Sequence, residues 1–240
     1  MKGPNDETIE NHRKGCFANK NPEDCHSLAD FFGLQENDWK KANAIYKVNC
    51  EEYRYAKSCL QYGNSLFTGS LDKGQHPNPV EALKYFQMGC EFGSHENCLN
   101  SGLLLVSPKL QGSALPRNLP KGIEFLNKSC DMNNGQACFY LSGIYMSGAD
   151  SSFKYSTEKT QNVKENLEIV ADMEKAFTFT KRACELKNMF ACANLSQMYA
   201  IGRGTQKDKE KSNHYKKVAE ELGEEYRRQR IIAHAHFKHP

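Results

Sequence analysis

The sequence lacks the features that are typical of membrane proteins and of several large enzyme classes. No apolar run approaches the ~18 residues that suggest a membrane span. No Gly-rich phosphate loop, G-x-S-x-G motif or H-E-x-x-H motif is present. The formal net charge is +3 at pH 7, which indicates neither a nucleic-acid partner nor an anionic membrane. We therefore expect a protein with no transmembrane segment and no nucleic-acid partner.

Hydrophobic residues are also scarce. They make up 39% of the chain even with Tyr and Cys counted. A core this thin would gain from covalent cross-links, each of which adds on the order of 2 to 3 kcal/mol when it closes a short loop. The chain contains ten cysteines, enough for a framework of disulfides.

The cysteines are spaced as five pairs, with separations of 9, 9, 8, 8 and 8 residues: Cys16 and Cys25, Cys50 and Cys59, Cys90 and Cys98, Cys130 and Cys138, Cys184 and Cys192. Eight residues of unbroken helix would separate two Cα atoms by roughly 12 Å, whereas a disulfide needs about 7 Å or less. The two cysteines of a pair can therefore bond only if the chain reverses direction between them.

The sequence around the pairs repeats a helical pattern on both sides. Eight residues before the first cysteine stands a small residue, and four and five residues before it stand mostly bulky ones. Four residues after the second cysteine stands another small residue, and seven after it an apolar one. These offsets each place the patterned positions on one face of a helix. The small positions are Ala42, Ala82, Gly122 and Ala176 in the first helices and Ala29, Gly63, Gly102, Ser142 and Ser196 in the second.

Turn-forming residues lie inside four of the five pairs: Pro22, Gly93, the stretch Asn133 to Gly135, and Asn188. The second pair encloses "EEYRYAKS", which has no helix breaker, and a turn is assigned there by analogy. The pattern predicts an all-α solenoid of helical hairpins, each stapled by a disulfide. The predicted units lie around 7–49, 50–89, 90–129, 130–183 and 184–222, with an insertion around 149–170 and a basic tail over 223–240.

The segment K-A-x-x-[FY]-x-x-x-A-C-E, followed by a turn and C-x2-L-[SG]-x-x-Y-x-x-G, resembles the cysteine-containing Sel1-like repeat, a relative of the tetratricopeptide repeat. The resemblance covers about residues 7–222, and the cysteine spacing is its specific part. Five pairs, and a first unit expected to lack a full helix before Cys16, resemble a mitochondrial group within this family. Glu220 departs from the pattern, since it stands where a sixth first-helix cysteine would be.

The resemblance implies a non-catalytic assembly factor for respiratory chain complexes, chiefly cytochrome c oxidase. Such a protein acts by contacts with assembly proteins, with the concave face of the solenoid as its expected working surface. We expect a monomer without a bound cofactor.

Five structural disulfides predict an oxidising compartment. The N-terminal stretch "MKGPNDETIENHRKGC" shows neither the apolar region of a secretory signal nor an Arg-rich presequence. The mitochondrial intermembrane space, with its oxidative import machinery as a partner, satisfies both observations. A secreted repeat protein that binds extracellular ligands is the alternative, since its signal peptide would have been removed.

A third hypothesis is a thiol-disulfide, haem-handling or metal-handling assembly enzyme. The weak metal candidates are His234, His236 and His239 near the C-terminus. Against this hypothesis, the sequence has no C-x-x-C motif of the kind used in redox catalysis or zinc knuckles, and no C-x-x-C-H haem attachment site. A haem held by other side chains stays open, with no axial residue identified.

Mapping of disulfide-linked peptides without reduction tests the repeat pattern. We expect five linked peptides, Cys16–Cys25, Cys50–Cys59, Cys90–Cys98, Cys130–Cys138 and Cys184–Cys192, since each hairpin brings only its own two cysteines together. A bridge between different repeats as the major species would contradict the hairpin arrangement.

Overall fold

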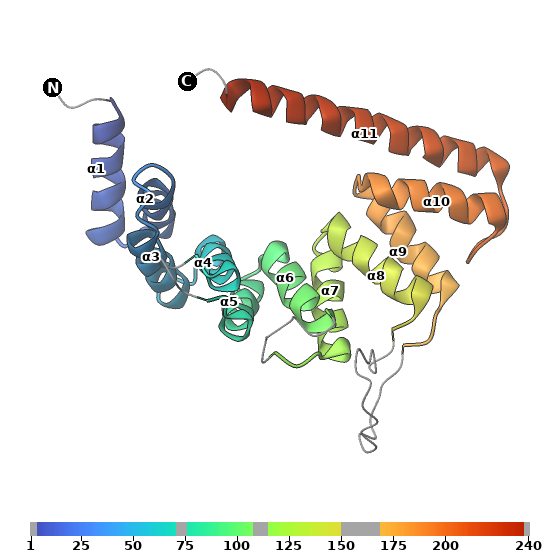
Figure 1. The fold of residues 1–240 in the computed structure, drawn as a ribbon, viewed down its shortest axis with the longest axis horizontal. Coiled ribbons are helices and arrows are strands. Elements are labelled where there is room, and N and C mark those ends of the chain that lie inside the picture. The colour runs from blue at the N-terminus through green and yellow to red at the C-terminus, as the bar shows by residue number, and fades with distance from the viewer. Residues whose placement is uncertain (1–3, 71–75, 108–114, 150–168, 238–240) are drawn as a thin grey trace, which may run out of the picture. The chain divides into compact units, whose positions relative to one another are not determined.

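A computed structural model describes residues 4–70, 76–107, 115–149 and 169–237 of the chain, with the backbone alone described for 4–6 and 232–237 (Figure 1). Within these ranges the regular structure is helical, apart from one antiparallel bridge between Ala149 and Ile169. None of the described helices combines the length and the apolar character that a membrane crossing requires. The helices are α1 (Pro4–Phe17), α2 (Pro22–Leu34), α3 (Trp39–Glu51), α4 (Ala56–Thr68), α5 (Pro79–Glu91), α6 (His95–Val106), α7 (Leu119–Asp131), α8 (Gly135–Ser147), α9 (Met173–Glu185), α10 (Met189–Ile201) and α11 (Lys209–Phe237).

The chain divides into two compact units, residues 1–125 and 126–240, and each is described by itself. In the first unit each helix packs against the next one along the chain, and α6 also contacts α4. In the second unit α9 packs against both α8 and α10, and α10 packs against α11. The prediction of an all-α array of helical hairpins is confirmed. The alignment of all five hairpins in one continuous solenoid stays a prediction.

Every hairpin reverses at one residue with a left-handed backbone, five positions before the second cysteine. These residues are Lys20, Arg54, Gly93, Asn133 and Lys187, with φ between 54° and 89°. The next residue is the N-cap of the second helix, and in four hairpins its side chain accepts hydrogen bonds from backbone N–H groups of the first turn. The separation of nine in the first two pairs therefore reflects one additional residue before the left-handed position. Arg54 supplies the turn that the sequence could assign only by analogy.

The reversal brings the two cysteines of each pair together. Their sulfur atoms lie 1.98 to 2.13 Å apart and their Cα atoms 4.5 to 4.9 Å apart. All ten side chains are buried, with exposed fractions of at most 6%. The disulfides are thus part of the core and close each hairpin beside its turn.

The small positions predicted from the repeat allow neighbouring helices to approach closely. A Cβ atom added to Gly63 of α4 would lie 2.6 Å from Cε1 of Phe86 on α5. In the same way, a Cβ on Gly122 of α7 would lie 3.1 Å from the carbonyl oxygen of Gly102 on α6. Ser142 on α8 is 1% exposed. These contacts agree with the predicted helix register, because each small residue lies beneath an adjacent helix.

The expectation that the first unit lacks a full helix before Cys16 is wrong. Helix α1 spans 14 residues and ends just after this cysteine. It has almost no apolar stripe, but Ile9 packs against the core and Nδ1 of His12 lies 2.8 Å from Oδ1 of Asp24 on α2. The carboxylate of Glu7 near its start and Lys14 in its last turn also suit the helix dipole.

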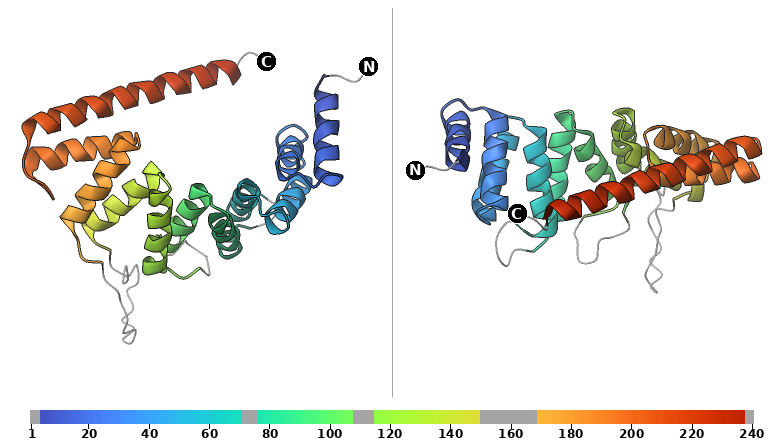
Figure 2. Two further views of the ribbon diagram at one scale, coloured as in Figure 1. Left: turned by 180° about the vertical axis from the view of Figure 1, so that it is seen from behind. Right: turned by 90° about the horizontal axis from the view of Figure 1, so that it is seen from above.

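Residues 223–237, expected as part of a basic tail beyond the repeats, instead continue α11, which spans 29 residues (Figure 2). Most residues on either side of Gly223 are strong helix formers. Lys217 and Glu221 pair at 3.7 Å, as do Glu224 and Arg228. Such i, i+4 pairs favour helix on both sides of the glycine. The insertion around 149–170 lies largely outside the described residues.

Substitutions at two glycines can distinguish the effect of backbone strain from the effect of side-chain packing. A Cβ atom at either Gly93 or Gly143 would meet no atom within 4 Å, but Gly93 has φ of 89° whereas Gly143 lies inside α8. We expect Gly93→Ala to lower the free energy of unfolding by about 1 kcal/mol, because alanine is strained in the left-handed region. The matched Gly143→Ala should raise it by about 0.5 to 1 kcal/mol. Denaturant titration of both variants measures this, and equal effects would contradict the assigned turn.

Candidate binding surfaces

The disulfides are placed for a structural role. A catalytic disulfide must present a sulfur atom to an incoming thiolate. The ten cysteine side chains are at most 6% exposed, and all of them are paired. This geometry favours the stapled scaffold over the thiol-disulfide enzyme.

A serine, a histidine and an aspartate lie together between α2 and α4. Nδ1 of His26 lies 2.9 Å from Oγ of Ser58, and its Nε2 lies 3.8 Å from Oδ2 of Asp30. Ser58 is fully buried and also accepts a hydrogen bond from Nδ2 of Asn49 at 2.8 Å. A nucleophile needs access to its substrate, so this constellation connects two hairpins rather than forming a catalytic triad.

The protonation of His26 is governed mainly by burial. Desolvation lowers the pKa of His26 below 6.5, and the cation of Lys57 acts in the same direction, while the carboxylate of Asp30 opposes the shift. In the neutral tautomer with its proton on Nε2, Nδ1 of His26 can accept a hydrogen bond from the Ser58 hydroxyl, whose oxygen accepts from Nδ2 of Asn49. The rings of Tyr46 and Tyr55 flank the imidazole at 5.4 Å.

The metal candidates cannot be placed. His239 and the side chains of His234 and His236 lie outside the described residues. Elsewhere in the described chain, no group of three or more His, Cys, Asp or Glu side chains is arranged to hold a metal ion.

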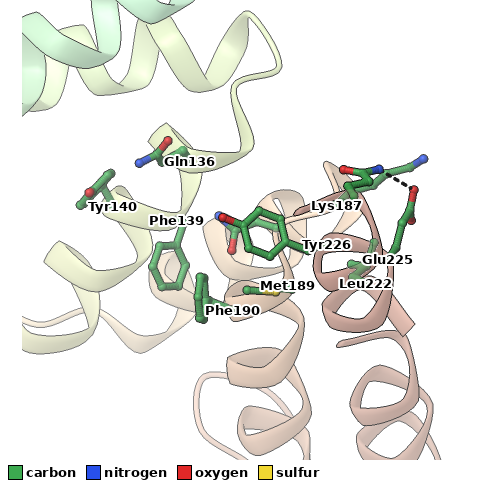
Figure 3. Close-up of a pocket in the computed structure, with 11 residues that line it drawn as sticks. Gln136, Phe139, Tyr140, Lys187, Met189, Phe190, Leu222, Glu225 and Tyr226 are labelled. Atoms are coloured by element: carbon green, nitrogen blue, oxygen red, sulfur yellow. Dashed lines mark hydrogen bonds between the residues drawn. The ribbon is translucent and has the colours of Figure 1, made fainter. Parts of the chain in front are cut away.

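The second unit carries an apolar groove with a volume of about 560 Å³, which we call the aromatic groove (Figure 3). It lies between the first turns of α8 and α10 and the middle of α11. Its apolar lining consists of Phe139, Tyr140, Met189, Phe190, Leu222 and Tyr226.

Several aromatic side chains that line this groove remain open to solvent. The rings of Phe139 and Phe190 lie 6.2 Å apart, and Figure 3 shows Tyr226 and Met189 beside them. Phe190 is 61% exposed, Tyr226 52% and Tyr140 38%. Apolar groups gathered in one exposed concave patch are typical of a protein-binding surface.

Sequence patterns did not find the aromatic groove, since its residues come from three helices and lie outside the repeated positions. Residues 226–230, "YRRQR", lie within the predicted basic tail and are exposed, but Tyr226 also lines the groove. The concave face of the whole array stays a predicted working surface.

The Sel1 repeat family matches residues 52–94, 106–134, 167–188 and 190–223. The chain is 44% identical over 232 residues to the cytochrome c oxidase assembly factor 7 homolog of Drosophila melanogaster, covering 91% of this chain and 87% of the fly protein. It is 30% identical over 214 residues to human cytochrome c oxidase assembly factor 7, covering 88% and 84%.

Solved structures with a similar fold are more distant in sequence. A Sel1 repeat protein from Oxalobacter formigenes superimposes with a TM-score of 0.64 at 18% identity, covering 90% of this chain and 84% of that protein. The protective antigen c5321 of uropathogenic Escherichia coli gives a TM-score of 0.65 at 18% identity, covering 88% and 40%. At this identity the likeness concerns the fold alone.

The His26 cluster predicts a pH dependence of stability. A pKa that folding lowers below 6.5 means that the unfolded chain binds the proton more readily. The contribution of His26 to the free energy of unfolding is therefore fully present above about pH 6.5. It decreases as the pH falls toward the lowered pKa. Between pH 7.5 and pH 5, the wild-type protein should lose more unfolding free energy than His26→Gln, whose amide oxygen can still accept from Ser58. Parallel curves for the two proteins in denaturant titrations would contradict this account.

Proposed function

Because this chain belongs to the Sel1 repeat family and, within it, to the family of cytochrome c oxidase assembly factor 7, we propose that it is a non-catalytic scaffold in the assembly of cytochrome c oxidase. It acts by binding other proteins of the assembly process. The names of the fly and human relatives support the process, since each match covers more than 80% of this chain and of the relative.

The aromatic groove is the structural feature that supports a role in protein binding. Exposed aromatic side chains lose contact with water when a partner covers them, and such residues contribute much of the affinity at protein interfaces. The groove suits an apolar or aromatic segment of an assembly protein. Lys187 and Glu225 at its edge offer one cation and one carboxylate for polar contacts around that segment.

The proposed site of action is the mitochondrial intermembrane space. Five buried disulfides support a compartment in which cysteines become oxidised, and the relatives' role in cytochrome c oxidase assembly supports the mitochondrion. Binding through the aromatic groove requires neither haem nor a metal ion.

Removing two rings from the groove tests this role. Tyr140 and Tyr226 are exposed, so the variant carrying Tyr140→Ala and Tyr226→Ala should fold with its five disulfides intact. In cells that lack the endogenous protein, we expect this variant to recover several-fold less of the oxidase assembly proteins on affinity purification. Cytochrome c oxidase activity should fall with it.

The matched control removes two aromatic rings elsewhere. Phe17 and Phe67 are 66% and 38% exposed, against 52% and 38% for Tyr226 and Tyr140, and both lie in the first unit. The variant with alanine at both phenylalanines should restore oxidase activity. Equal activity of the groove variant and the wild type, at equal protein levels, would refute the role of the groove.

A further inference from the structure

Helix α11 corresponds to the first helix of a sixth repeat unit. Glu220 occupies the position of the first cysteine, and Ser212, eight residues earlier, occupies the small position. Oγ of Ser196 on α10 donates to the carbonyl oxygen of Ser212 at 2.8 Å. This contact joins the same two repeat positions that meet in the close approach of Gly102 and Gly122. The first half of α11 therefore packs on α10 as α7 packs on α6.

In the first unit, the next helix covers one such groove. Helix α6 packs against α5 and also contacts α4, so it lies over the groove between them. The equivalent groove between α10 and α11 has a volume of about 570 Å³ and is open. Its lining includes the small residues Ala193, Ala219 and Gly223 and the charged residues Lys216, Glu220, Glu224 and Arg227. We call it the terminal groove.

The second half of α11 projects beyond α10. A Cβ on Gly223 would lie 3.9 Å from Sδ of Met189, which is the first residue of α10, so residues 224–237 extend past the end of that helix. Residues 224–231 are all exposed, and Ile231 is 69% exposed. This projecting segment is one residue longer than the 13-residue α10. The chain thus has an open groove of repeat geometry and a projecting helical segment of about the matching length, which is exposed over residues 224–231.

The charges of the two halves of α11 are complementary when two such helices run antiparallel. Lys216, Glu220, Gly223, Arg227 and Ile231 lie on one face, since each is three or four residues from the next. If two copies cross near Gly223, each Glu220 lies opposite the other copy's Arg227, and each Lys216 lies opposite the other copy's Ile231. Neither Glu220 nor Arg227 forms an ion pair within the described chain.

We propose that the terminal groove binds residues 224–237 of a second copy of this chain, so that two copies form a two-fold dimer through antiparallel α11 helices. The interface is isologous, with two identical Glu220–Arg227 contacts and close approach at Gly223. This assembly goes beyond the proposed scaffold function and departs from the monomer expected from the sequence.

Cross-linking at the centre of the helix pair tests the arrangement. Gly223→Cys introduces a thiol where an added Cβ meets only Met189 at 3.9 Å, so the variant should fold. The matched control is Gly143→Cys, at an exposed glycine within α8 of the same unit. With the purified, oxidised full chain, we expect Gly223→Cys to form a disulfide-linked dimer at least tenfold faster than the control. Equal rates would overturn the proposal.

Charge reversal tests the contact without a new cysteine. Glu220→Arg alone and Arg227→Glu alone should each raise the dimer dissociation constant about tenfold, since every dimer then places two pairs of like charges in contact. The double variant Glu220→Arg, Arg227→Glu should return to within about threefold of the wild type, because the pairing is restored in reverse.

Analytical ultracentrifugation over a range of protein concentrations measures these constants. A wild-type chain that stays monomeric at every concentration would overturn the proposal, including the case in which residues 224–237 fold back onto their own terminal groove. The variant carrying Tyr140→Ala alone should still dimerise, because Tyr140 lies on α8, outside both the terminal groove and residues 224–237. Loss of partner binding and loss of self-association can therefore be told apart.

Discussion

The structure depends on the reversal of the chain between the two cysteines of each pair. A left-handed residue turns the backbone, an N-cap begins the second helix, and the disulfide joins the last turn of one helix to the first turn of the next. Four of the five left-handed residues are not glycine, so the turns carry strain. The disulfide holds the helices together across this strained turn, and the small residues then let adjacent hairpins pack closely.

The repeat positions could be predicted from the sequence because each has a simple geometric requirement. Cysteines eight or nine residues apart need a reversal, and Gly63 needs a neighbour such as Phe86 above it. The turns themselves were harder, since Lys20, Arg54 and Lys187 are common helix residues and only their tertiary context places them in the left-handed region. Helix α1 was missed because a single apolar residue that packs against the core, Ile9, gives no apolar periodicity in the sequence.

The binding surfaces could not be predicted because no single stretch of sequence contains them. Phe139, Phe190 and Tyr226 come from three helices and meet only through the packing of α8, α10 and α11. The repeat explains why this region is suited to binding. In α8 and α10 the cysteines and small residues take up the buried face, while Tyr140 and Phe190, each two positions from a cysteine, remain exposed. The same framework can therefore stay constant while its exposed residues determine the partner.

The end of the array imposes a further constraint. Each hairpin leaves a groove for the next, so a repeat protein must close its last groove, and terminal repeats commonly do so with a polar outer helix. Here α11 is largely charged, yet its first half still packs with repeat geometry, while Ile231 and Tyr226 in its second half remain exposed. A cysteine at position 220 would require a sixth hairpin to pair with. With Glu220 at this position, no further disulfide is needed. Its carboxylate can instead pair with a cation on another helix, so a reversible contact takes the place of a covalent one.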